Sequence, residues 1–145
     1  MQGPVITRVK QSIKQDFPVF VALVKVFWIA HGARSHLELI KLFFFTVWKR
    51  IVRRKAFVTP FELYLSTPYG VTAVRIRDMA DITTTCAVFA EGEYDLPPSL
   101  SEVKTILDLG SNIGVSVAYF RLRYPVARIY AVEADPATFK RLQEN

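Results

Sequence analysis

The chain has 145 residues, of which 51% are hydrophobic and 22% are charged. This composition is too apolar for a disordered protein, and the length suits one globular domain of ordinary size. The single cysteine, Cys86, excludes an intrachain disulfide framework and a metal site built from cysteines. Cys86 lies in an apolar run, so we expect a buried structural thiol rather than a nucleophile.

The net charge of +6 is unevenly distributed along the chain. Residues 1–60 contain eleven Lys/Arg and two acidic residues, a net charge of +9. Residues 61–145 contain eight Lys/Arg and eleven acidic residues, a net charge of −3. The basic character therefore belongs to an N-terminal arm.

An apolar stretch over residues 17–30 is the first predicted element. It contains Lys25 and has fourteen residues, whereas a membrane-spanning helix needs about twenty apolar residues, so we do not expect it to span a membrane. The residues before it lack the layout and the cleavage site of a secretory signal. We expect a cytoplasmic protein, with peripheral membrane contact through residues 17–55 left open.

A second helix is predicted from apolar residues spaced three and four apart. They are Leu37, Ile40, Phe44, Val47, Trp48 and Ile51. Lys/Arg side chains crowd the same segment toward its C-terminal end, at positions 41, 49, 50, 53, 54 and 55. The helix either lies on an anionic membrane surface or in a partner's groove, or it is a lid that packs on its own domain, which we favour. Nucleic acid is the least favoured partner, because charge alone does not distinguish its phosphates from lipid headgroups.

A β-hairpin is predicted next, with strands on either side of a turn at residues 66–70. Pro68 and Gly70 are turn formers, by fixed and by permissive φ respectively. Asp81 is predicted to cap a helix over Thr83–Ala90. A loop with Pro97 and Pro98 then leads to the most informative part of the chain.

Residues 105–136 show a strand, a glycine-bearing turn, a helix and a second strand. Residues 103–108 suit a buried parallel strand, and the turn follows as Asp108–Gly114. The predicted helix runs from Ile113 to Arg123, because it must end before Pro125. The second strand, Arg128–Val132, leads into Glu133, after which Asp135 caps a further helix with Pro136 at its first position.

These residue types suit a nucleotide site. Gly110 lets the backbone pass close to a ligand, and Gly114 permits the helix to pack tightly on the strand. The helix N-terminus offers amides that favour a carboxylate or phosphate. Glu133 follows the glycines by about twenty residues, the place where ribose hydroxyls are held in doubly wound folds.

The spacing of the glycines argues against a dinucleotide as the ligand. The dinucleotide fingerprint is G-x-G-x-x-G, whereas this turn is Gly-x-Asn-x-Gly. Counted from Gly114, the last glycine position falls on Val117. Asp108 would also be poorly placed beside a pyrophosphate, a conflict that a cationic sulfonium does not have. The turn therefore favours S-adenosylmethionine over NAD.

The run ILDLGSNIGVSVAYF resembles motif I of class I S-adenosylmethionine-dependent methyltransferases, specifically of the FkbM family. That family shows a D-x-G-A-N-x-G turn and an E-P-D-P segment. Here Ser111 stands at the usual alanine, and Ala134 at the first proline of that segment. The strong resemblance covers Thr105–Asn145, a weaker one covers Arg77–Tyr94, and the first sixty residues show none.

The resemblance implies an α/β fold: the beginning of a Rossmann-like class I methyltransferase sheet, with its first two βα units. A β-hairpin and an N-terminal helical arm precede it. We divide the chain into a basic, aromatic-rich helical arm (1–55), a hairpin, helix and loop (56–100), and the start of the cofactor-binding domain (101–145). A complete sheet of this class has about seven strands, so we expect a truncated piece of a longer protein.

The resemblance also implies the cofactor, S-adenosylmethionine, and its binding residues. These are Asp108, Gly110, Ser111, Asn112, Gly114 and Glu133. The turn would line the methionine end and Glu133 the ribose, while Asn112 has helix capping as a further role. We predict no metal site.

The function implied is O-methylation of a hydroxyl on a sugar or other natural product, so that the acceptor is a small molecule or glycan. An alcohol acceptor needs a base, and the sequence identifies none. We expect the two histidines, His31 and His36, to be structural or exposed. The chain alone is expected to bind cofactor weakly and to be inactive. Two alternatives stay open: an RNA or protein methyltransferase, and a non-catalytic membrane-surface or protein-interaction module that uses the basic arm.

Overall fold

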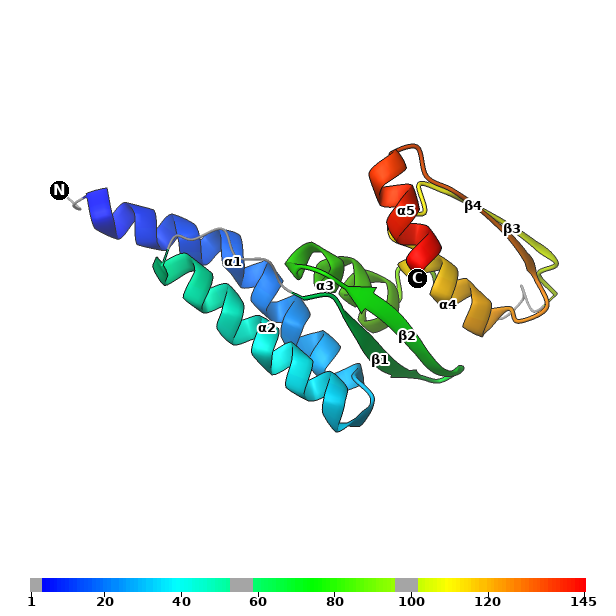
Figure 1. Ribbon diagram of the computed structural model, residues 1–145, viewed down its shortest axis with the longest axis horizontal. Coiled ribbons are helices and arrows are strands. Elements are labelled where there is room, and N and C mark those ends of the chain that lie inside the picture. The colour runs from blue at the N-terminus through cyan, green and yellow to red at the C-terminus, as the bar shows by residue number, and fades with distance from the viewer. Residues whose placement is uncertain (1–3, 53–58, 96–101) are drawn as a thin grey trace.

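The computed structural model describes residues 4–52, 59–95 and 102–145, with side chains from residue 17 and, in the second helix, as far as residue 47. In chain order the elements are α1 (Pro4–Ile29), α2 (Gly32–Val52), β1 (Phe61–Thr67), β2 (Gly70–Ile76), α3 (Met79–Thr85), a π-helical turn η1 (Cys86–Ala90), β3 (Thr105–Leu109), α4 (Val115–Arg123), β4 (Arg128–Val132) and α5 (Pro136–Glu144). The helical pair α1/α2 lies at one end and β3/β4 at the other, with the hairpin, α3 and α4 between them (Figure 1).

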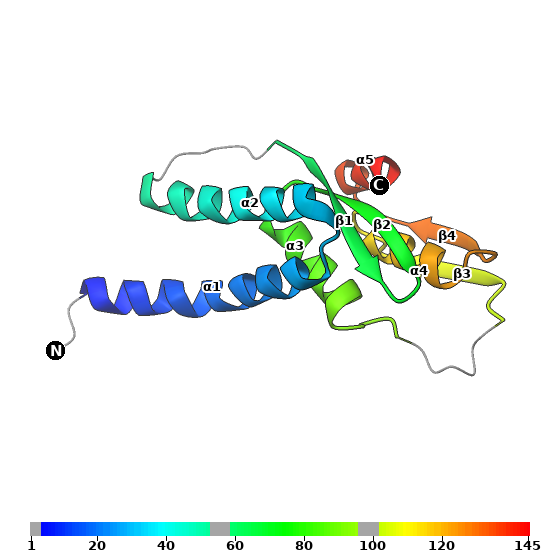
Figure 2. The same ribbon diagram turned by 90° about the horizontal axis from the view of Figure 1, so that it is seen from below.

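The first two helices lie side by side, joined by a short turn, and extend away from the sheets (Figure 2). Helix α1 begins at Pro4, well before the predicted apolar stretch, and keeps Pro18 inside it. In the part of the chain that is described, no helix combines the length and apolarity needed to cross a bilayer.

The helical pair packs on the rest of the chain through Ala22, Leu23 and Val26 of α1 and Leu39 and Leu42 of α2, all of them buried. These residues meet β1, α3 and η1. Packing on its own domain is what the lid interpretation predicts.

Our prediction of which face of α2 packs on the domain is, however, wrong. Leu37, Ile40, Phe44 and Val47 are exposed, Phe44 by 64%. Trp48 and Ile51 lie outside the residues whose side chains are described. The buried face lies about half a turn away, because α2 has apolar residues on two sides and β1 packs against one of them.

Backbone contacts fix the turn between α1 and α2 to the hairpin. His31 donates its backbone N–H to the carbonyl of Tyr64 (2.7 Å), and Ala30 forms an isolated bridge with Leu65. The N–H of Tyr64 in turn donates to Oγ of the buried Ser35 (3.1 Å). The helical pair is therefore attached to β1 by hydrogen bonds as well as by apolar packing.

The predicted hairpin is confirmed. Strands β1 and β2 are antiparallel, in register from Phe61 opposite Ile76 to Thr67 opposite Gly70. Alternate residues point into the core, including Leu63 and Val74.

The predicted cap of the next helix is wrong by one turn. Asp78, not Asp81, is the N-cap of α3, and its carboxylate accepts from the N–H groups of Ala80 (2.9 Å) and Asp81 (3.1 Å). The side chain of Asp81 reaches back to the N–H of Asp78 (3.3 Å), which completes a capping box. The helix starts earlier because Asp78 and Asp81 satisfy its first amides together.

The C-terminal part is a βαβ unit. Strands β3 and β4 pair in parallel, as predicted, and α4 connects them. Helix α4 lies between this pair and the hairpin, and it buries Tyr119 and Phe120. The expectation of a fully buried strand is wrong, because Leu107 and Leu109 are 62% and 71% exposed on the face away from α4.

The fold of the described residues is thus mixed α/β, with two separate two-stranded sheets. The parallel pair carries the predicted strand–turn–helix–strand order. A larger doubly wound sheet is not formed by the described residues.

Candidate functional site

The predicted site residues meet where the two parallel strands end. Asp108 pairs with Ala131, and Leu109 pairs with Val132, so the two strands finish level. The loop 110–114 follows β3, and Glu133 follows β4, which places both at the same edge of the sheet. In open α/β sheets this carboxyl edge is where ligands bind.

Main-chain hydrogen bonds hold the loop against the end of β4. The N–H groups of Gly110 (2.8 Å) and Ser111 (3.0 Å) both donate to the carbonyl of Val132. Oγ of Ser111 accepts from the N–H of Val132 (3.1 Å) and donates to the carbonyl of Asp108 (2.9 Å). Ser111 is buried, and its hydroxyl holds the turn.

Glu133 is fixed by the loop that it faces. Its Oε2 accepts from the N–H of Asn112 (2.9 Å) and its Oε1 from the N–H of Asp135 (2.9 Å). Asn112 reaches this position with a φ of 49°, in the left-handed region. A carboxylate has about four acceptor positions, so each oxygen retains room for one more donor, such as a hydroxyl.

Asp108 lies behind the loop and is only 8% exposed. Its Oδ2 accepts from Oγ of Ser116 (2.7 Å), in the first turn of α4. Sequence reasoning missed Ser116. The signal was a lone hydroxyl between Val115 and Val117, at the start of a helix that otherwise begins with apolar residues. Ser116 holds the carboxylate of Asp108 against α4.

Gly114 faces the end of α5 rather than the strand, which corrects the sequence-based expectation. Its φ is +90°, and a Cβ built on it would lie 2.7 Å from Cδ1 of Leu142. Nearby, Nδ2 of Asn145 donates to the carbonyl of Ile113 (2.6 Å). The end of α5 therefore supports the loop from the side opposite β4.

Gly110, in contrast, faces open space. Its φ is +81°, and a Cβ built there would meet no atom within 4 Å. Helix α4 starts at Val115 with Gly114 as its N-cap and no side-chain cap, so the predicted capping role of Asn112 is wrong. The start of α4 therefore has no side-chain capping hydrogen bond for its first amides.

These features fit a ligand that carries both a carboxylate and a ribose. Uncapped helix amides favour the carboxylate, an open glycine permits close approach, and Glu133 can accept from hydroxyls. Helix α5 begins just beyond, at Pro136, with Asp135 as its N-cap (2.7 Å to the N–H of Thr138), as predicted. Hydrogen bonds to Thr138 hold the pKa of Asp135 below its usual value.

The histidines and the cysteine lie away from this edge. His36 contacts the carbonyl of Gly32 through Nδ1 (2.9 Å) and packs edge-on against Phe27 (ring centroids 4.6 Å apart). His31 lies in the turn before it. Cys86 is buried, as predicted, and burial raises the pKa of its thiol. Within the described ranges, no three His, Cys, Asp or Glu side chains group together in a way that could hold a metal ion.

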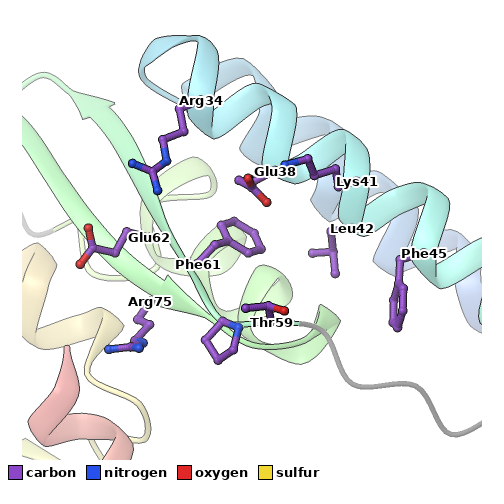
Figure 3. Close-up of a pocket in the computed structure, with 10 residues that line it drawn as sticks. Arg34, Glu38, Lys41, Leu42, Phe45, Thr59, Phe61, Glu62 and Arg75 are labelled. Carbon is purple, nitrogen blue, oxygen red and sulfur yellow. Dashed lines mark hydrogen bonds and ion pairs between the residues drawn. The ribbon is translucent and has the colours of Figure 1, made fainter.

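A cavity of about 730 Å³ opens elsewhere, between α2 and the hairpin (Figure 3). Side chains of both signs line it, among them Arg34, Glu38, Lys41, Glu62 and Arg75. Nζ of Lys41 pairs with Oε1 of Glu38 at 2.8 Å. None of the predicted site residues lines this cavity, so it is separate from the edge of the parallel strands.

Comparison with known proteins found one relevant likeness. A stretch of 58 residues, 40% of this chain, is 38% identical to the protein named Methyltransferase 1 of Beauveria bassiana (strain ARSEF 2860). The match spans 23% of the length of that protein. No family model matches the chain, and no solved structure matches it. The likeness supports a methyltransferase in general terms.

Proposed function

We propose that this chain is part of an S-adenosylmethionine-dependent methyltransferase, and that the edge formed by the loop 110–114 and Glu133 holds the cofactor. The observation that carries the proposal is the placement of an open glycine, an uncapped helix start and a fixed carboxylate at the ends of two parallel strands. The partial likeness to Methyltransferase 1 agrees with it.

Each residue has a distinct part in this proposal. The first amides of α4 bind the carboxylate of the methionine moiety, and Gly110 leaves room for it. Glu133 accepts from the ribose hydroxyls. Ser111 and Ser116 act as positioning residues, because their hydroxyls are engaged with the loop and with Asp108. When bound, the cofactor supplies a methyl group already activated by its sulfonium, so the protein's task is to align it with the acceptor and exclude water.

The acceptor class rests on the resemblance to the FkbM family. We propose O-methylation of a hydroxyl on a sugar or other natural product. The Glu-Ala-Asp-Pro segment after β4 is the feature that favours this class over an RNA or protein acceptor.

The exposed apolar face of the parallel strands indicates what the chain would need for activity. Parallel sheets are normally covered on both faces, whereas Leu107 and Leu109 of β3 are largely exposed. We infer that a catalytically complete domain has further elements on this face and beside β3 or β4. The chain by itself is then expected to bind cofactor weakly and to show no turnover.

The test is a titration of the ¹⁵N-labelled chain with S-adenosylhomocysteine, the stable product, and separately with NAD⁺. We expect millimolar binding of the first, with the largest amide shifts at Gly110, Asn112 and Gly114. Glu133→Gln should reduce these shifts at equal ligand concentration. Glu62→Gln, at an exposed acid of the separate cavity beside α2, is the control and should leave them unchanged.

Equal shifts with NAD⁺, or no shift at the loop with either ligand, would overturn the cofactor assignment. Micromolar binding together with methyl transfer to an added sugar would instead contradict the inference that the chain is incomplete.

A further inference from the structure

The helical pair carries an apolar surface on the side away from the core. On α1 the exposed residues Phe17, Phe20, Val24, Phe27 and Trp28 recur at spacings of three and four or lie beside one another. On α2 the exposed residues Leu37, Ile40, Phe44 and Val47 do the same. Each set forms one stripe of its helix, opposite the buried face. We call these nine residues the aromatic face.

The two stripes form one continuous surface. An apolar groove of about 330 Å³ runs between the helices, and its walls include Phe20 and Phe27 from α1 and Ile40 and Phe44 from α2. Phe43 also lines it, with its ring 5.9 Å from that of Phe20 and 5.5 Å from that of Phe44. Scattered exposed apolar residues are ordinary, but a continuous patch of this kind marks an interaction surface.

The charge around the aromatic face is strongly positive. Residues 1–60 carry a net charge of +9, and their only acidic residues are Asp16 and Glu38. Glu38 is paired with Lys41 on the side of α2 that faces the hairpin. Because α1 and α2 are antiparallel neighbours, the basic residues in the first part of α1 and those at positions 49 and 50 of α2 lie at the same end of the pair (Figure 2).

We propose that the aromatic face docks on an anionic membrane surface, independently of the proposed methyltransferase site. Aromatic side chains on one face of a helix with Lys/Arg around them are the features of interfacial helices. Trp28, with 83% of its surface exposed, suits the boundary between headgroups and acyl chains. The pair lies flat on the bilayer and does not cross it.

A second copy of the chain suits the aromatic face less well. Two copies would bring together two arms that each carry a net charge of +9, and like charges oppose such pairing. An anionic bilayer brings the opposite charge. Charge complementarity therefore selects the lipid surface.

The experiment is flotation of the whole chain with vesicles of phosphatidylcholine alone and of phosphatidylcholine with about one third phosphatidylserine. We expect at least tenfold tighter binding to the anionic vesicles, and loss of this difference in 0.5 M NaCl. Trp28→Ser with Phe44→Ser should weaken binding at least tenfold. The matched control is Leu107→Ser with Val126→Ser, which removes two exposed apolar side chains elsewhere and should change nothing.

A second pair of variants separates charge from apolar contact. Lys49→Glu with Arg50→Glu should remove the preference for anionic vesicles. Arg128→Glu with Lys140→Glu makes the same change of net charge on exposed residues far from the arm, and should reduce it much less. Circular dichroism of each variant checks that the helices are retained.

Three results would overturn the proposal. The first is equal binding to neutral and anionic vesicles, and the second is unchanged binding of the Trp28/Phe44 variant. The third is a dimer in sedimentation velocity that this variant converts to a monomer without any effect on vesicles, since a second copy would then cover the aromatic face. Loss of nucleotide binding at the loop would leave the membrane result unaffected, so the two proposals fail separately.

Discussion

The helical pair and the βαβ unit are held by different interactions. The pair packs mainly through buried apolar residues such as Val26 and Leu39, and hydrogen bonds join its turn to β1. The loop after β3 is held by hydrogen bonds from Gly110, Ser111 and Asn112 to Val132 and Glu133, and by the buried side chain of Ile113. Polar contacts within a short loop depend on nearby residues, whereas apolar packing depends on whatever surface a helix meets.

This difference explains which parts of the structure the sequence patterns predict correctly. The loop residues lie within about 25 positions of one another, so the glycine spacing and the acid after β4 mark the loop in the sequence, although they do not give the partner of each side chain. The apolar residues of α2 fall on two faces, and periodicity alone cannot tell which one becomes buried. Four predictions test how far the contrast holds, from the largest effect to the smallest.

The largest effect is expected where α5 is joined to the middle of the chain. The buried carboxylate of Asp81 accepts two bonds from Nη2 of Arg141, at 2.6 and 2.7 Å, and one from the N–H of Arg77 (2.7 Å). Asp81→Ala leaves the guanidinium without its partner, and should lower the free energy of unfolding by about 3–5 kcal/mol. Urea denaturation measures this.

The comparison variant for this ion pair is Glu144→Ala. Its partner is Arg77, and both side chains are about one third exposed. Removal of this pair should cost at most about 1 kcal/mol. Equal effects of the two variants would show that Asp81 does not join α5 to the core.

The second prediction contrasts the two faces of α2. Leu39→Ala empties a fully buried site and should destabilise the protein by about 2–4 kcal/mol. Leu37→Ala, on the aromatic face, should change stability by no more than about 0.5 kcal/mol. The reverse order would mean that the face predicted from the sequence is the one that packs.

The third prediction contrasts the two glycines of the loop. Gly110→Ala and Gly114→Ala both place a Cβ at positive φ and should each cost about 1–2 kcal/mol. Gly114→Ala should cost more, because its Cβ also meets Leu142. Combined with Gly114→Ala, Leu142→Ala should relieve that extra destabilisation, whereas combined with Gly110→Ala it should leave the cost unchanged. Thermal unfolding of the single and double variants measures both. If the effects of Gly114→Ala and Leu142→Ala on stability were additive, Leu142 would not contact the loop.

The smallest effect concerns Tyr119 of α4. Its hydroxyl donates to Oδ1 of Asp95 (2.6 Å), and burial together with this carboxylate raises the pKa of Tyr119 well above its ordinary value near 10. The folded state therefore holds this proton more tightly, so its contribution to stability is complete below about pH 10 and is lost as the pH rises further. Tyr119→Phe should cost about 1 kcal/mol at pH 7 and flatten the alkaline decline. Urea midpoints from pH 7 to 11 measure both, and an unchanged decline would contradict this role.

Sequence reasoning predicted much of the C-terminal part. The parallel pairing of β3 with β4 and Asp135 as the cap of α5 were both expected. It missed Ser116 as the partner of Asp108, and Arg141 and Asn145 as links from α5 to the rest. The contacts of Arg141 and Asn145 join residues up to 70 positions apart, and no local pattern encodes them.

The sequence by itself determined the helices, the hairpin and the polar loop, because hydrophobic period, turn residues and caps act over a few positions. Only the tertiary structure decided that Gly114 faces α5 and that the aromatic face stays outside. The physical reason is shared: each outcome depends on which apolar or charged surface arrives from a distant part of the chain. The loop is formed by residues that are close in the sequence, whereas the surfaces that pack around it come from distant parts of the chain.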